Sequence, residues 1–312
     1  MPIENPVKTK IICRRSFLTI FSGALAIARG AQPESTPLPN RPKVPGTMLL
    51  RARLRVEQPP GSGSIRVTEE PLRWEVAQTA IIIIDMWDAH TCHLSAQRVA
   101  AMAPRMNQVV SAARSLGVMI IHAPSDTMKF YAGRPERLRM QQAATAASPF
   151  PVRATEPDRD ESRKLPDAAC DDPVFQTFKG PAPPTTRGLY PWEREHPAIE
   201  IAGYDGISDS GQEIYNFCKQ EGITNIALMG VHTNICILNR AFGVREMKKL
   251  GLNVVVARDL TDAMYDPRKR PFVSHTRGTE LVVEHIEANW CPSISSEDLT
   301  KVTPGSDGPI SR

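Results

Sequence analysis

The sequence predicts a three-layer α/β/α domain with a central, mostly parallel sheet. Residues 81–84 are four consecutive isoleucines that lead into Asp85, and a continuous β-branched run of this kind is typical of a strand buried on both faces. Residues 95–115 then carry apolar side chains at helical spacing, and 118–123 form a second apolar run. Strands that alternate with helices build a parallel sheet that is covered by helices on both faces.

The same alternation continues in the second half of the chain. Further strands are expected at 198–201, 225–229 and 252–257, and further helices at 209–221, 234–249 and 276–288. In open parallel sheets, ligands bind beyond the carboxyl ends of the strands. Asp85 and the turn 230–232 both follow strands, so they mark the expected position of a site.

Two regions fall outside this alternation. Residues 47–76 contain short alternating stretches on either side of the turn-forming sequence 59–63, which predicts an N-terminal β-hairpin at the edge of the domain. Residues 124–197 are rich in proline and charge and contain no clear repeat. We therefore expect a long irregular insertion that shapes the site.

The composition is that of an ordinary globular protein. Hydrophobic residues make up 41 % of the 312 residues and charged residues 23 %, both usual values. The formal net charge is +4, and much of the excess lies near the N-terminus, at Lys8, Lys10, Arg14 and Arg15. The remainder is close to neutral, which argues against a nucleic-acid partner and leaves a small-molecule substrate as the expected ligand.

The N-terminus resembles a twin-arginine export signal. Arg14 and Arg15 precede an apolar stretch at 17–28, which is too short for a membrane span of ~20 residues. Small residues that follow it offer a cleavage site. We expect an exported, periplasmic protein that is not inserted in the membrane after signal removal; the alternative is a basic tail on a cytoplasmic protein. The expected segments are a signal at 1–31, a linker at 32–46, a single domain at 47–297 and a C-terminal tail at 298–312.

None of the six cysteines forms a C-x-x-C or zinc-ligand spacing, which argues against a metal cluster of that kind. In an oxidising compartment some of them could pair, and the sequence does not choose the partners. The cysteines are Cys13, Cys92, Cys170, Cys218, Cys236 and Cys291.

Cys236 is the strongest candidate for a nucleophile. It ends the segment 230–236, which joins an expected strand to an expected helix. In the first turn of a helix, free backbone amides and the helix dipole favour a thiolate, and the same amides can hold an oxyanion. The alternative is that Cys236 is a small buried hydrophobic residue.

An acid at the end of the first strand, followed later by a G-x-x-T-N-x-C turn after another strand, resembles the isochorismatase-like cysteine hydrolases. This superfamily includes nicotinamidases, N-carbamoylsarcosine amidases and isochorismatases. The similarity covers most of 79–292 and is carried by the segments 81–85, 222–236 and 251–259.

The resemblance implies a role for each matching residue. Cys236 would be the nucleophile and Asp85 its base, although Asp85 could also be a strand-end cap. A non-proline cis peptide would join Val231 to His232, and the amides of Ile235 and Cys236 would form the oxyanion hole. Relatives of this kind also imply a homo-oligomer.

The chain departs from the family pattern at one position. A lysine is expected at the end of the strand before the 209–221 helix, near Ala202 or Gly203, and none is present there. A positive charge could come from elsewhere. Lys179 is a tentative substitute, with a plain surface lysine as the alternative, and Arg194 is a second candidate that would act only through its charge.

Polar and aromatic residues near Asp85 suggest further ligands. Trp87, His232 and Asn234 are expected in the substrate pocket, where Trp87 packs against the substrate or the insertion and His232 either faces the site or is simply buried. No cofactor is required, but a divalent metal could be held by nitrogen and oxygen ligands, with a polar pocket mouth as the alternative. Those candidate ligands are Asp88, His90, His93 and Asp126.

The leading hypothesis is a cysteine hydrolase that cleaves the C–N bond of a small amide through a thioacyl-enzyme intermediate. The missing lysine motivates a second hypothesis, a catalytically impaired binding domain that kept the fold. A third is vinyl-ether hydrolysis of the isochorismatase kind, which does not require Cys236 as nucleophile.

Overall fold

The computed structural model describes residues 38–39, 41–157, 159–173 and 190–305, all within one compact unit that begins at Leu38. The predicted export signal and Lys179 lie outside the described residues. Within the described part, no helix is long and apolar enough to cross a membrane.

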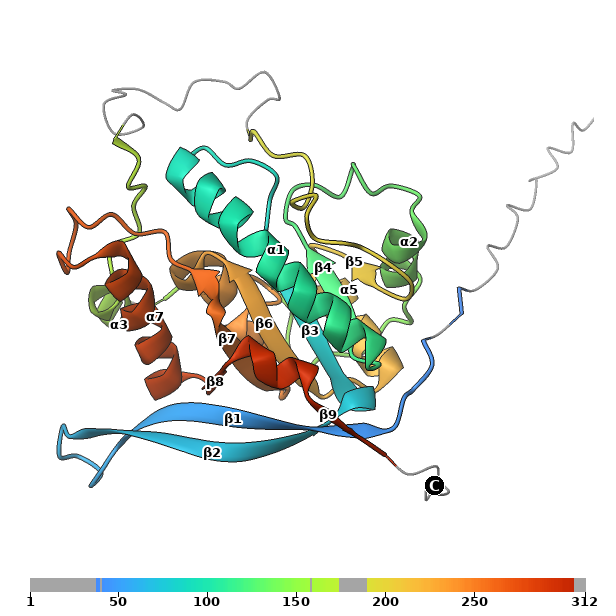
Figure 1. Ribbon diagram of the computed structural model, residues 1–312, viewed down its shortest axis with the longest axis horizontal. Helices are drawn as coiled ribbons and strands as arrows, with labels where there is room; N and C mark the ends of the chain where they lie inside the picture. The colour runs from blue at the N-terminus through green and yellow to red at the C-terminus, as the bar shows by residue number, and fades with distance from the viewer. Residues whose placement is uncertain (1–37, 40, 158, 174–189, 306–312) are drawn as a thin grey trace, which may run out of the picture. The chain divides into compact units, whose positions relative to one another are not determined.

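The core of the protein is a nine-stranded sheet with the order β2-β1-β8-β7-β6-β3-β4-β5, in which β9 pairs with β1 (Figure 1). The strands from β8 to β5 run parallel to their neighbours. Every residue of β3 is buried, as its continuous apolar run predicts. These parallel strands are β3 (Thr79–Ile84), β4 (Met119–Ala123), β5 (Gly206–Ile207), β6 (Asn225–Val231), β7 (Asn253–Asp262) and β8 (Ser293–Ile294).

Helices cover both faces of the sheet, which confirms the three-layer α/β/α architecture. On one face, α1 (His93–Ser115) packs with Ile81 and Ile83 of β3 in one buried cluster. On the other face, a second cluster joins Ile82 and Ile84 to three helices. These are α5 (Gly211–Glu221), α6 (Val244–Lys249) and α7 (His275–Asn289).

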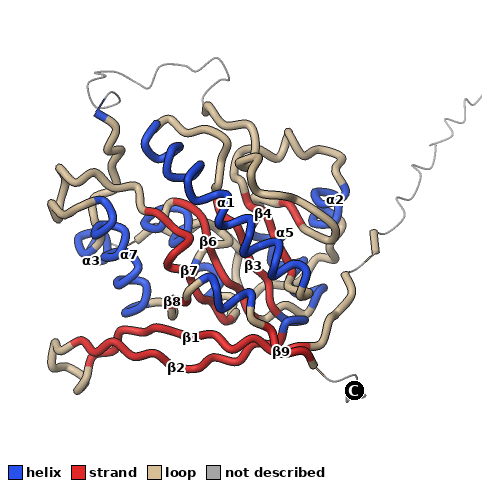
Figure 2. The backbone as a smooth tube through the Cα atoms, in the orientation of Figure 1, coloured by secondary structure: helices blue, strands red, loops and turns tan. Residues whose placement is uncertain are grey.

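The predicted hairpin is present as the antiparallel pair β1 (Gly46–Glu57) and β2 (Ile65–Glu75), which runs along one edge of the sheet (Figure 2). A short helix η1 (Val76–Gln78) leads from it into β3. The segment expected as a C-terminal tail from 298 contributes to the fold, because η3 (Ser296–Thr300) leads into β9 (Val302–Pro304), which pairs with the start of β1.

Two expected elements differ in the structure. The strand expected at 198–201 is wrong: Ile199 packs into the α1 side of the core instead, and the short β5 pairs with β4. The single helix expected at 234–249 is wrong as well, because it is divided into η2 (Thr233–Ile237) and α6. Gly243 lies at the break, where a Cβ would come within 2.6 Å of the Ile237 carbonyl.

The described part of the insertion is mostly irregular, as its composition predicts. It contains two short helices, α2 (Pro135–Gln141) and α3 (Arg159–Lys164). Its later part returns to the sheet at an isolated bridge between Trp87 and Glu195. The insertion therefore contacts the loop that follows β3, where the candidate site begins.

Candidate active site

The carboxyl edge of the sheet brings Asp85 and Cys236 together. Ile84, the last residue of β3, pairs with Gly230, the residue before the end of the neighbouring strand β6. Asp85 follows β3 directly, and η2, which carries Cys236, follows β6. Gly230 permits the approach because its φ is 115° and a Cβ there would overlap the Ile84 carbonyl. Only glycine tolerates both conditions.

The turn between β6 and η2 contains a non-proline cis peptide bond between Val231 and His232, at the position that the family resemblance implies. The backbone N–H of His232 donates a hydrogen bond to the sulfur of Cys236. The amide of Ile235 donates to the carbonyl of His232 at 3.0 Å. Of the two amides expected in an oxyanion hole, that of Ile235 is therefore already engaged by the backbone.

The carboxylate of Asp85 is fully buried and hydrogen-bonded. Its Oδ1 accepts from the backbone N–H of Ser125 at 2.8 Å, and its Oδ2 accepts from Nε of Arg240 at 3.2 Å. It is also the hydrogen-bond partner of the Cys236 thiol. Burial raises the pKa of Asp85, while the charge of Arg240 opposes that rise. A carboxylate in this position can receive the thiol proton and later return it.

The surroundings of the Cys236 thiol disfavour its thiolate form. Its pKa lies well above the ordinary value because burial disfavours the thiolate and the negative charge of Asp85 adds to that effect. Both effects oppose the stabilisation of a thiolate that the start of a helix was expected to give. The helical turn η2 has only five residues, and its dipole and the nearby Arg240 do not offset the desolvation of a buried anion.

Arg240 provides a positive charge beside Asp85, whereas the sequence predicted Lys179 or Arg194 for this role. It lies four residues after Cys236, and its backbone N–H donates to the Cys236 carbonyl at 3.0 Å, so both side chains are on one side of the turn. Its guanidinium forms an ion pair with Asp85. The i, i+4 spacing from the nucleophile was the signal in the sequence that could have identified it.

Arg194, the other described candidate for that charge, lies elsewhere. Its guanidinium packs over the ring of Phe130, with 5.5 Å between its Cζ and the ring centroid. Its Nε is 3.9 Å from the carboxylate of Asp88. Arg194 therefore does not replace the family lysine beside Asp85.

A stack of aromatic rings forms beside this site. Trp87 stacks on Trp192 with 4.3 Å between ring centroids, and Tyr190 stacks on Trp192 at 4.5 Å. The indole N–H of Trp87 donates to the Ser125 carbonyl at 2.9 Å. Trp87 thus packs against the insertion, one of the two arrangements expected for it. Trp192 was missed, because nothing local in the sequence shows where the insertion returns.

His232 is buried against His90, with 5.1 Å between the two ring centroids. Burial lowers the pKa of His232 to about 3 and that of His90 to about 4. Both imidazoles are therefore neutral at pH 7. Within the described part of the chain, Nε2 of His232 has no hydrogen-bond partner.

The side chain of Asn234 has a structural role. Its Nδ2 donates to the carbonyl of Met264 at 3.0 Å, and its Oδ1 accepts from the N–H of Met264 at 3.0 Å. The amide group is therefore engaged in holding the loop after β7, although it was expected to contact substrate.

The residues considered as metal ligands are not gathered at one point. A metal site needs several His, Cys, Asp or Glu side chains whose ligand atoms lie close together. Among the described residues, three or more such atoms lie within 4.8 Å of one another only at Cys92, Cys170 and Asp171. The two cysteines of this group are bonded to each other. The candidate residues therefore do not fit a divalent metal. Those residues are Asp88, His90, His93 and Asp126.

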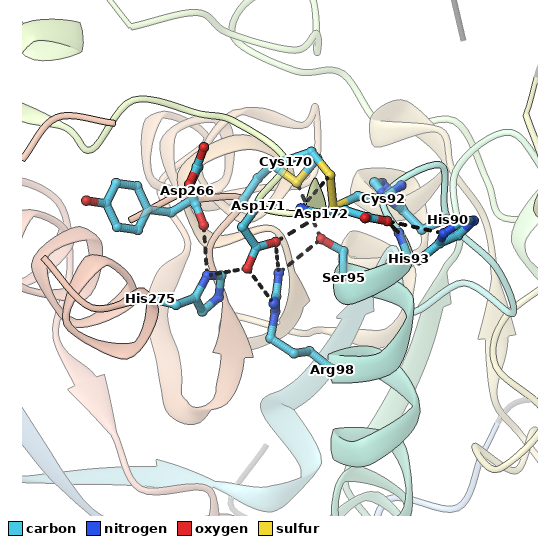
Figure 3. The surroundings of a disulfide bond; sticks show 12 residues. His90, Cys92, His93, Ser95, Arg98, Cys170, Asp171, Asp172, Asp266 and His275 are labelled. Carbon is cyan, nitrogen blue, oxygen red and sulfur yellow. Dashed lines mark hydrogen bonds and ion pairs between the residues drawn. A yellow bond between two sulfur atoms is a disulfide. The ribbon is translucent and has the colours of Figure 1, made fainter. Parts of the chain in front are cut away.

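A disulfide joins Cys92, at the start of α1, to Cys170 in the insertion (Figure 3). The next residue, Asp171, forms ion pairs with Arg98 of α1 at 2.9 Å and with His275 of α7 at 3.4 Å. The disulfide and the ion pairs of Asp171 together fix the insertion to α1 and to the first residue of α7, close to the loop that carries Trp87 and His90.

The Isochorismatase domain family matches residues 79–277, well over half of the chain. No curated protein matches the chain. Among solved structures, a cysteine hydrolase from Pseudomonas syringae pv. phaseolicola 1448A is 15 % identical, with a TM-score of 0.43, and the match covers 73 % of this chain and 94 % of that chain. The N-carbamoylsarcosine amidase from Thermoplasma acidophilum is 13 % identical, with a TM-score of 0.37, covering 70 % and 97 %.

A cysteine and an aspartate that meet at the carboxyl edge of a parallel sheet define an α/β protein with a cysteine–carboxylate site. The chain belongs to the isochorismatase family, whose members are hydrolases.

Proposed function

We propose that this protein is a cysteine hydrolase that cleaves the C–N bond of a small amide-type substrate through a thioacyl-enzyme intermediate. The observation that carries the proposal is the buried contact of Asp85 with both the Cys236 thiol and the Arg240 guanidinium. It supports the proposal because a thiol, a carboxylate and a guanidinium meet at one edge of the sheet, where they could act as nucleophile, base and fixed positive charge.

The proposed reaction has two stages. Asp85 takes the thiol proton while the sulfur of Cys236 attacks the carbonyl carbon and forms a C–S bond. The C–N bond then breaks, and the protonated Asp85 gives its proton to the leaving nitrogen. In the second stage, Asp85 accepts a proton from water, which attacks the thioester, releases a carboxylic acid and restores the thiol.

Arg240 contributes charge and takes no part in proton transfer. An arginine remains protonated at any accessible pH, so Asp85 alone carries the proton in both stages. The guanidinium keeps one positive charge beside the buried Asp85 and Cys236, and it lowers the pKa of both groups. It thereby reduces the cost of forming a thiolate in a desolvated site.

The decisive experiment replaces the nucleophile. Cys236→Ala is expected to reduce hydrolysis in an amide panel by at least ~10³-fold, and intact-mass measurement should detect an acyl adduct on the wild type only. Cys218→Ala is a matched control, because Cys218 is a free and buried cysteine on α5. Unchanged turnover of Cys236→Ala would show that the mechanism is wrong. Retained activity on a vinyl ether would favour the isochorismatase kind of reaction.

The impaired binding domain was motivated by the missing lysine. Since Arg240 contacts Asp85, the site has a positive charge after all, and we favour the hydrolase. The binding domain predicts instead that ligands are recovered chemically unchanged after incubation with the protein.

We also propose export through the twin-arginine-like signal, with the mature protein in the periplasm as a homo-oligomer. The disulfide between Cys92 and Cys170 supports export, because such bonds persist in oxidising compartments. Replacing Arg14 and Arg15 by lysine is expected to leave the protein in the cytoplasmic fraction. Unchanged fractionation would contradict the export proposal.

A further inference from the structure

The guanidinium of Arg240 is only partly engaged by the protein. Of the five N–H donors of an arginine, one, on Nε, bonds to Asp85. Within the described part of the chain, Nη1 and Nη2 of Arg240 donate to no other group, and the side chain is 34 % exposed. The end of the guanidinium that faces away from Asp85 is therefore available to a ligand.

Arg98, another partly buried arginine of this protein, is engaged along its whole guanidinium. Its Nε donates to Asp262 at 2.9 Å, while Nη1 and Nη2 both donate to Asp171. Partly buried N–H groups that lack an acceptor cost free energy unless water or a ligand supplies one. The guanidinium nitrogens of Arg98 all have acceptors within the described part of the protein, whereas those of Arg240 do not. This difference is particular to the candidate site.

The available end of Arg240 lies close to the nucleophile. Arg240 follows Cys236 by one helical turn, and its charge acts on the thiol. The negative charge of Asp126 also favours the protonated form of Arg240 and so raises its pKa, but the two side chains do not form an ion pair within 4.0 Å. An anion bound to Nη1 and Nη2 would therefore lie beside the sulfur without displacing an existing partner.

We propose that Nη1 and Nη2 of Arg240 bind a carboxylate of the substrate, so that the enzyme selects small amides that carry a carboxylate near the scissile carbonyl. The inference rests on the proposed hydrolase function. The planar fork of a guanidinium matches a carboxylate with two parallel hydrogen bonds. A lysine beside Asp85 would offer one point charge with no second planar end, so arginine adds recognition to the electrostatic role.

Two alkylating reagents test this without knowledge of the substrate. Iodoacetate and iodoacetamide both lose iodide as the Cys236 sulfur forms a C–S bond, and they differ only in a carboxylate or a neutral amide. The thiolate fraction cancels in the ratio of their rates. The rate of alkylation by iodoacetate divided by the rate of alkylation by iodoacetamide should be about tenfold or more higher for Cys236 in the wild type than for N-acetylcysteine. Cys236→Ser measures the background from other cysteines.

Substitutions then assign the effect to the guanidinium. Arg240→Gln should bring the ratio close to that of the free thiol, and Arg240→Lys should give an intermediate value. Arg194→Gln is the matched control, because Arg194 is 43 % exposed and pairs with Asp88 instead, and it should leave the ratio unchanged. If Arg194→Gln lowered the ratio of the two alkylation rates as much as Arg240→Gln does, the assignment to Arg240 would be overturned.

A measurement on the wild type alone keeps the proposal testable if Arg240 variants do not fold. Added acetate should slow iodoacetamide alkylation of Cys236, while acetamide should not. A wild-type ratio equal to that of N-acetylcysteine, with no protection by acetate, would refute carboxylate binding. If amide hydrolysis still depended on Cys236 in that case, only this inference would fail. A clear carboxylate preference without any hydrolysis would refute the proposed function instead.

Discussion

The disulfide between Cys92 and Cys170 is expected to provide a large share of the free energy of unfolding. It closes a loop with a sequence separation of 78 residues. For a loop of that length, the loss of chain entropy in the unfolded state corresponds to about 4.5 kcal/mol at 25 °C. Domains are typically stable by ~5–15 kcal/mol in total, so the bond would contribute the equivalent of roughly 30 % of that stability or more.

Urea unfolding of the oxidised and the reduced wild type measures this contribution. Both forms contain the same sulfur atoms, so the difference isolates the cross-link. Reduction should lower the free energy of unfolding by about 4.5 kcal/mol and increase the m-value, because an unfolded chain without the cross-link exposes more surface. The double variant Cys92→Ala with Cys170→Ala should behave like the reduced wild type or be slightly less stable.

Cys291→Ala is a suitable control, because Cys291 is a free and buried cysteine. It removes a thiol without opening a loop, so it should cost only ~1 kcal/mol and leave the m-value unchanged. A loss below ~1 kcal/mol on reduction, with no change in the m-value, would refute the reasoning. The ion pairs of Asp171 with Arg98 and His275 would then hold the insertion by themselves.

Three further predictions concern single residues. Asp85→Asn should reduce hydrolysis by ~10²–10⁴-fold yet accelerate alkylation of Cys236 at fixed pH, because the charge that raises the thiol pKa is gone; slower alkylation would contradict this. His122, between the Glu195 and Asp205 carboxylates, has a pKa raised to about 9 from 6.5. Its contribution to stability is therefore fully present below pH 6.5 and lost as the pH rises through about 9, and unfolding at pH 6 and 9.5 should show a decline that His122→Asn lacks. Gly230→Ala should destabilise the fold by ~3 kcal/mol or more, and a thermal midpoint equal to that of the wild type would refute the steric argument.

The sequence by itself determined the fold class and the position of the site. The isoleucines at 81–84 are apolar at every position because β3 is buried on both faces of the sheet. The strand-turn-helix pattern located Cys236, and the strand end located Asp85. The fold class and these strand-end positions could be predicted because burial, strand periodicity and turns are local properties, which neighbouring residues report directly.

Tertiary structure alone decided which distant groups complete the site. Arg240 meets Asp85 across a separation of 155 residues, and Trp192 returns from the insertion to stack on Trp87. The raised pKa of the Cys236 thiol likewise depends on burial and on the charge of Asp85. Long-range contacts and desolvation depend on how separate segments pack, and no local pattern encodes that packing.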